Sequence, residues 1–152
     1  MASKPKAIIV DIDGTLANIQ HRVHFIEGPG KKDWDGFNSV LHLDEPKKEI
    51  MEIVRAMKFY DENLAILLVT GRFNTHRLET VEWLLKHQVD WQGLYMRCDG
   101  DYRSDAIIKR IIYRDIIEPH YNVVAVFEDR DKVVKMWREL GLTCLQVAEG
   151  DF

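Results

Sequence analysis

The stretch KAIIVDIDGTL, residues 6–16, joins a short apolar run to two aspartates that are separated by one residue. The apolar run is typical of a strand buried on both faces of a sheet, and the change to Asp-x-Asp-Gly marks its carboxyl end. In open parallel α/β sheets, ligands bind at that end. In an extended backbone Asp11 and Asp13 point the same way, and two close carboxylates need a cation or a proton between them. We therefore expect the active centre at this point of the chain.

Length and composition predict one globular domain over residues 1–152, with 46% hydrophobic and 30% charged residues. The net charge of −4 argues against binding of an extended duplex, although a site for one terminal phosphate needs only a few local cations. No apolar run approaches the ~18 residues of a membrane span, so we expect no membrane contact. With two cysteines and no room for a secretory signal before the first strand, a cytoplasmic location is the expectation.

Predicted strands and helices alternate along the rest of the chain. The predicted strands span residues 7–10, 64–69, 94–96, 123–127 and 142–147. The predicted helices span residues 34–41, 46–60, 75–87, 105–117 and 133–140. This alternation predicts an α/β fold with a central parallel sheet and helices on both faces. The polar segment 17–46 is longer than a simple connection needs, and we expect a small helical cap there, inserted after the first strand.

Polar clusters follow the predicted strands or begin the helices that face them. These clusters are Asp11/Asp13, Thr70/Gly71/Arg72, Asp105/Lys109 and Glu128/Asp129/Asp131. The carboxyl ends of parallel strands meet at one crevice, so we expect the clusters to lie close together. Carboxylates with water and phosphate are the ligands that Mg²⁺ prefers, and this combination is typical of a phosphoryl-transfer site.

In this order the motifs resemble the signature of the haloacid dehalogenase-like hydrolase superfamily. That signature is a strand ending in Asp-x-Asp-Gly-Thr, followed by Ser/Thr, then Lys, then acidic residues. The chain is also similar to the 3′-phosphatase domain of bacteriophage polynucleotide kinase/phosphatase. This closer resemblance rests on Asp11 to Arg22, Thr70-Gly71-Arg72, Gly100-Asp101-x-Arg103-x-Asp105 with Lys109, and the tail from Val134 to Phe152. It implies a Rossmannoid three-layer sandwich.

The resemblance also implies roles for the carboxylates. Asp11 would be the nucleophile that takes the phosphoryl group, and Asp13 would protonate the leaving oxygen and then activate water. Mg²⁺ would bind Asp11, the backbone carbonyl of Asp13, and Asp129. The family commonly has an aspartate where this chain has Glu128, whose longer side chain could still reach the metal through water.

The remaining roles concern the substrate phosphate and the charge balance. By resemblance, the phosphate would be held by Thr70, the backbone of Gly71, Arg22 and Arg72. Lys109 would neutralise charge on the nucleophile and phosphate, and Asp105, one helical turn earlier, would orient Lys109.

Several alternatives stay open at this stage. Arg22 could be an ordinary surface arginine, and Asp131 could simply begin a helix. Trp34 and Phe37 could stack on a substrate base, but their helical spacing favours a miniature core for the cap.

The expected function is that of a Mg²⁺-dependent phosphatase that removes 3′-phosphates from DNA or RNA ends through an aspartyl-phosphate, as a step in nucleic-acid repair. The alternatives are a phosphatase of free nucleotides or other small phosphoesters, and a non-catalytic binding protein of the same fold. This chain has no Walker loop, so we expect no kinase activity from it, and whether a separate chain supplies a kinase or ligase is left open. DNA versus RNA preference and the oligomeric state are left open.

Overall fold

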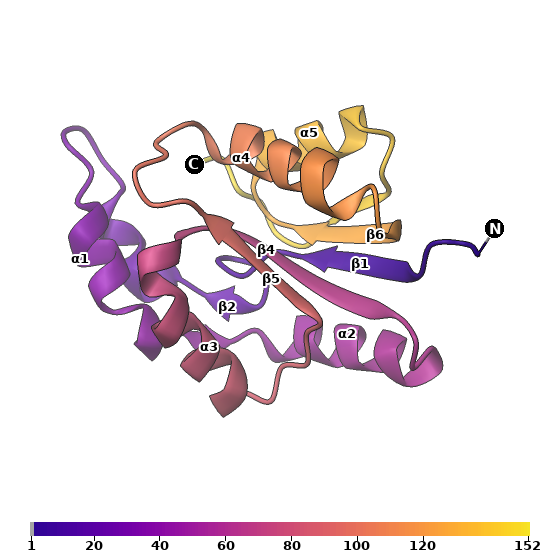
Figure 1. The fold of residues 1–152 in the computed structure, drawn as a ribbon. Coiled ribbons are helices and arrows are strands. Elements are labelled where there is room, and N and C mark those ends of the chain that lie inside the picture. The colour runs from indigo at the N-terminus through magenta and orange to yellow at the C-terminus, as the bar shows by residue number, and fades with distance from the viewer. Residues whose placement is uncertain (1) are drawn as a thin grey trace.

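The computed structural model describes residues 2–152, which form a central sheet between two layers of helices (Figure 1). The sheet has five parallel strands in the order β5-β4-β1-β6-β7. These strands are β1 (Lys6–Val10), β4 (Ala65–Phe73), β5 (Gly93–Arg97), β6 (Asn122–Glu128) and β7 (Cys144–Gln146). The predicted α/β fold is confirmed, and β1 occupies the centre of the sheet.

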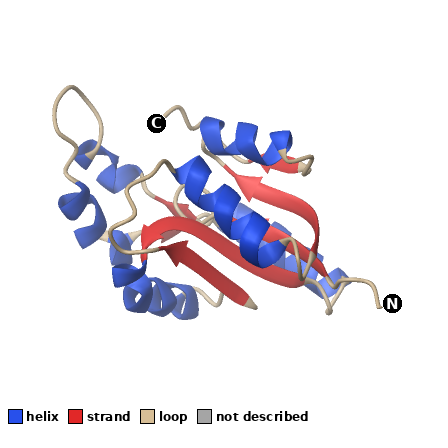
Figure 2. Cartoon of the chain, turned by 45° about the horizontal axis from the view of Figure 1, so that its top comes forward, coloured by secondary structure: helices blue, strands red, loops and turns tan. Residues whose placement is uncertain are grey.

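Two helices cover each face of the sheet (Figures 1 and 2). These helices are α2 (Lys48–Tyr60) and α3 (Arg77–Lys86) on one face, and α4 (Asp105–Ile112) and α5 (Asp131–Glu139) on the other. The strand β1 contributes side chains to the core on both faces of the sheet. Ile8 and Val10 pack in the core beneath α2 and α3, whereas Ala7 and Ile9 pack toward α4 and α5. This alternation buries residues 7–10 of β1 and fixes the register of the strand, since a shift by one residue would exchange the two faces.

The segment after β1 forms the expected insert. Its elements are β2 (Ala17–Asn18), a 3₁₀-helix (Gln20–Phe25), α1 (Trp34–Ser39), a 3₁₀-helix (Leu41–Leu43) and β3 (Glu45–Pro46). The side chain of Asp33 accepts a hydrogen bond from the backbone N–H of Gly36 and so caps α1. The strands β2 and β3 pair antiparallel, which closes the insert at its base.

The structure corrects several predicted boundaries. The strand β4 does not stop at Val69 but stays extended through Thr70, Gly71 and Arg72, with an irregular register toward β5. Pro46 belongs to β3, so the next helix begins at Lys48. Within the predicted helix 105–117, Ser104 caps the start and the last five residues form a π-helical turn.

Among the described residues, no helix has the length and apolar character needed to cross a membrane.

Candidate active site

A cleft of about 680 Å³ opens at the carboxyl ends of the central strands. The end of β1 contributes Asp11, the extended end of β4 contributes Thr70, and the end of β6 leads into Asp129. Parallel strands converge at this edge, so residues far apart in the sequence share one cleft. The structure therefore confirms the prediction that the polar clusters at the strand ends lie close together.

Lys109 connects three of the carboxylates. Its ammonium donates hydrogen bonds to Asp11 and Glu128, each at 2.8 Å, and lies 3.4 Å from Asp105. All four side chains are buried or nearly so, and the nearby acids raise the pKa of Lys109 against the effect of burial, which alone would lower it. Lys109 is therefore charged and holds Asp11 in one orientation.

Asp11, Glu128 and Asp129 form a compact acidic cluster whose candidate ligand oxygens all lie within 4.8 Å of one another. Burial, followed by the charge of Glu128, raises the pKa of Asp11, and burial with the charge of Asp11 raises the pKa of Asp129 to about 7. The ammonium of Lys109 does not neutralise all three buried carboxylates. The side-chain atoms that could bind a metal here are all oxygens. The cluster fits a hard divalent cation, which these carboxylates would hold.

Two glycines allow the acidic groups to approach the strand ends. A Cβ on Gly14 would lie 2.1 Å from an oxygen of Asp129, and Gly14 also has a φ of +85°, which favours glycine. A Cβ on Gly71 would lie 2.3 Å from Oδ1 of Asp105. Both positions therefore need a residue without a side chain.

Asp13 lies at the same cleft but has different partners from Asp11. Its carboxylate forms ion pairs with Arg22 and Arg72, each at 2.6 Å, and does not belong to the acidic cluster. The two side chains line the same cleft, as expected, but they have different partners there, because the backbone leaves the extended conformation after Val10. Burial alone would raise the pKa of Asp13, but the guanidiniums of Arg72 and Arg22 hold it well below its usual range.

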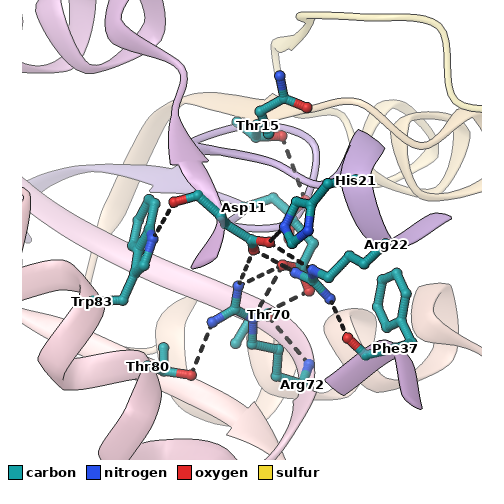
Figure 3. A network of polar contacts seen from close by, with 12 residues as sticks. Asp11, Thr15, His21, Arg22, Phe37, Thr70, Arg72, Thr80 and Trp83 are labelled. Atoms are coloured by element: carbon teal, nitrogen blue, oxygen red, sulfur yellow. Dashed lines mark hydrogen bonds and ion pairs between the residues drawn. The ribbon is translucent and has the colours of Figure 1, made fainter. Parts of the chain in front are cut away.

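Arg22 and Arg72 reach the active site from different elements. Arg22 is 0% exposed, with its guanidinium 4.1 Å from the ring centroid of Phe37, so the surface-arginine alternative is wrong. Arg72 lines the cleft, and its guanidinium also donates to the hydroxyl of Thr80 (Figure 3). The predicted contact of both arginines with substrate phosphate stays a prediction; in this structure both guanidiniums bind carboxylates.

Asp44 joins the two arginines, and the sequence reasoning missed it. Its buried carboxylate accepts hydrogen bonds from Nε and Nη2 of Arg22 at 2.7 and 2.6 Å, and from Arg72 at 3.3 Å. His21 contacts the same carboxylate at 2.7 Å, and the indole N–H of Trp83 donates to the backbone carbonyl of Asp44 (Figure 3). No spacing motif marks Asp44; the only signal was an acidic residue in a segment that also holds Arg22.

Two further predicted residues lie at the cleft. The hydroxyl of Thr70 accepts a hydrogen bond from the backbone N–H of Arg72, which orients Thr70 at the end of β4. Asp105 contacts Lys109 as expected, and also lies 3.6 Å from the guanidinium of Arg97. Its Oδ1 is buried and accepts no hydrogen bond from any described residue.

Comparison with known families gives one match over nearly the whole chain. Residues 5–152 match the family model described as the polynucleotide kinase PNKP phosphatase domain. A relative from Autographa californica nuclear polyhedrosis virus, named as a putative bifunctional polynucleotide kinase/RNA ligase, is 28% identical over 137 residues. That match covers 90% of this chain but 18% of the viral protein.

Solved structures give a consistent result. A chain of the Pnkp1/Rnl/Hen1 complex has a TM-score of 0.84 and 35% identity, and the match covers 100% of this chain and 49% of that chain. CbbY from Rhodobacter sphaeroides, solved with phosphate, has a TM-score of 0.61 at 16% identity, over 97% of this chain and 87% of that chain. A haloacid dehalogenase-like hydrolase from Streptococcus pneumoniae has a TM-score of 0.63 at 12% identity, over 92% and 83% of the two chains. The last two similarities concern the fold alone.

Proposed function

The chain belongs to the family of polynucleotide kinase PNKP phosphatase domains, and from that premise we propose that it removes 3′-phosphates from polynucleotide ends. The observation that carries this proposal is the position of Asp11, which is fixed by Lys109 on one side and borders Asp129 on the other, at a cleft open to solvent. The chain spans about half the length of the matched chain of the Pnkp1/Rnl/Hen1 complex and less of the viral protein, so the substrate belongs to the proposal.

The first chemical step is transfer of the phosphoryl group to Asp11. A carboxylate oxygen of Asp11 attacks phosphorus, the bond from phosphorus to the 3′ oxygen breaks, and that oxygen takes a proton from Asp13. Mg²⁺ held by Asp11, Asp129 and the backbone carbonyl of Asp13 would reduce the repulsion between the anionic nucleophile and the phosphate. Glu128 directs one oxygen to Lys109 and the other to the backbone N–H of Asp129, and so holds both neighbours in place beside the metal site.

The second step returns Asp11 to its free form. Water attacks phosphorus, Asp13 takes the proton from that water, and the bond between phosphorus and Asp11 breaks to release inorganic phosphate. The two arginines keep Asp13 ionised in the structure, which suits this base role. A substrate phosphate competes with Asp13 for Arg72 and adds negative charge, so it raises the pKa of Asp13 for the first step.

Phosphate release from a 3′-phosphorylated oligonucleotide, compared with mononucleotides and sugar phosphates, tests the proposed substrate. We expect the highest kcat/KM for the oligonucleotide in the presence of Mg²⁺, and loss of the activity on chelation. A preference for the monomers would contradict the polynucleotide substrate while leaving the phosphatase chemistry intact. A non-catalytic role is disfavoured, because Asp11, Asp13 and the acidic cluster line one cleft and Lys109 contacts Asp11.

An accompanying kinase or ligase activity is part of the same proposal. The viral relative is named as a kinase/ligase, and the similar solved chain belongs to a complex. Removal of a 3′-phosphate leaves a 3′-hydroxyl, which is the end that a ligation reaction requires.

A further inference from the structure

Aromatic side chains from two separate segments lie at the mouth of the cleft, where the proposed chemistry does not use them. Trp34 begins α1 in the insert, and Tyr102 lies in the loop between β5 and α4. Trp34 is 45% exposed and Tyr102 is 84% exposed, although both line the cleft. The expectation that Trp34 and Phe37 together form the core of the insert is therefore wrong for Trp34; only Phe37 is buried.

Each exposed ring is supported by a second aromatic ring. Trp34 contacts Phe37 edge to face, with the ring centroids 5.6 Å apart. Tyr102 packs against Phe73 at 5.5 Å, and Phe73 itself lies at the end of β4. A ring that is braced on one side and exposed elsewhere keeps a defined orientation, so it loses little conformational freedom when a planar ligand stacks on it.

Positive charges accompany aromatic rings around this opening. The ammonium of Lys32 lies 5.6 Å from the centroid of Trp34, and the guanidinium of Arg130 lies 5.1 Å from the centroid of Phe152. Arg130 and Phe152 both line the cleft. Aromatic rings next to cations are the combination that binds single-stranded nucleic acid, because the rings take the bases and the cations take the backbone phosphates.

We propose that Trp34 and Tyr102 form a stacking site for the unpaired nucleobases next to the 3′-phosphate. This inference rests on the proposed function and narrows its substrate to single-stranded ends. A cleft of about 680 Å³ is within the range of small-ligand pockets, a size suited to terminal nucleotides. Bases at a paired end already stack on their neighbours, so these rings gain less from them. Because every base has a π-face, the site takes terminal bases of any sequence.

Substrates with and without terminal bases test the stacking site. Steady-state kinetics are measured on a single-stranded 3′-phosphorylated oligonucleotide and on one whose terminal nucleotides are abasic, in DNA and RNA versions. The variants are Trp34→Ala and Tyr102→Ala, and Tyr60→Ala is the matched control because Tyr60 is 92% exposed on α2 and lies outside the cleft. Tyr102 projects from a loop, so its truncation leaves the core intact.

We expect Trp34→Ala and Tyr102→Ala each to raise KM for the intact oligonucleotide about 5- to 100-fold. The same variants should change KM for the abasic substrate less than about twofold, because the stacking partner is already missing. Tyr60→Ala should have the same KM as the unmodified protein for both substrates. An effect in only one polymer supports the site and identifies that polymer as the substrate.

Equal KM values for intact and abasic substrates in the unmodified protein would overturn the stacking site and leave the 3′-phosphatase proposal standing. Equal losses on both substrates in the alanine variants would also overturn it, since that result indicates a structural role. If the protein released phosphate from mononucleotides but from no oligonucleotide, the proposed function would fall, and the stacking site with it.

Discussion

At the scale of single residues, the site depends on how buried charges balance. Lys109 neutralises part of the charge on Asp11 and Glu128, and the two arginines neutralise Asp13. The two aspartates of the first motif therefore have opposite electrostatic surroundings although one residue separates them. The pKa of Asp11 is raised and that of Asp13 is lowered, which distinguishes the proposed nucleophile beside the acidic cluster from the proposed acid/base group.

Substituting Gly14 tests how closely Asp129 must approach the first motif. In Gly14→Ala the new Cβ would lie 2.1 Å from an Asp129 oxygen, so we expect Asp129 to shift and the affinity for Mg²⁺ to fall at least about tenfold. Isothermal titration with Mg²⁺ measures the change.

Gly28→Ala is the matched control for that experiment. Gly28 has the same φ of +85°, but nothing lies within 4 Å of its Cβ position. The control therefore carries only the backbone strain, about 1 kcal/mol of stability, and should bind Mg²⁺ normally. Equal Mg²⁺ affinity in the two variants would show that the close approach does not matter.

At the scale of elements, the central sheet brings the catalytic groups together and the insert supplies their support. The first motif, the Lys109 helix and the acidic end of β6 follow from local patterns, namely apolar runs that end in carboxylates and a capped amphipathic helix. That is why the fold and the acidic cluster could be predicted from the sequence.

Other features depend on contacts between distant segments and left no local pattern. Arg22 and Asp44 are 22 residues apart and Arg72 is 28 residues beyond Asp44, so nothing in either segment indicates that the three meet. The continuation of β4 through Gly71 was also missed, because a glycine after Thr70 is typical of a turn. In the structure this glycine instead makes room for Asp105.

We expect Asp44 to stabilise the packing of the insert against the sheet. In Asp44→Ala the buried Arg22 loses two hydrogen bonds and one counter-charge, so we expect the free energy of unfolding to fall by about 3–5 kcal/mol. Urea unfolding followed by circular dichroism measures this change. Glu45→Ala, at the neighbouring exposed position, is the control and should change the stability by less than about 0.5 kcal/mol. A loss for Asp44→Ala no larger than for the control would refute the role assigned to Asp44.

At the scale of the whole molecule, folding keeps an acidic cluster in the core that the unfolded chain would expose to water. The pKa of Asp129 rises from 3.8 to about 7 on folding. Between these values the folded, metal-free protein holds a proton that the unfolded chain releases, so rising pH favours unfolding. A bound divalent cation would take the place of that proton.

The stability of the metal-free protein should therefore fall as pH rises from about 4 to about 7, by at most about 1.4 kcal/mol per pH unit for this group. Urea unfolding in EDTA and in Mg²⁺ across this range measures the trend. We expect Mg²⁺ to stabilise the protein more at the upper end of the range, because metal binding releases the proton. In Asp129→Asn the free energy of unfolding of the metal-free protein should fall less steeply with pH. A slope of the same size in that variant would show that another group is responsible.

Trapping of the phosphorylated protein tests the central claim most directly, namely that Asp11 carries the phosphoryl group. The protein is mixed with an oligonucleotide bearing a radioactive 3′-phosphate, quenched with acid during turnover, and digested for peptide mapping. We expect the label on the peptide that contains Asp11, and no label with Asp11→Asn. Phosphate release without a labelled protein in the unmodified chain, or a label on another residue, would contradict the account.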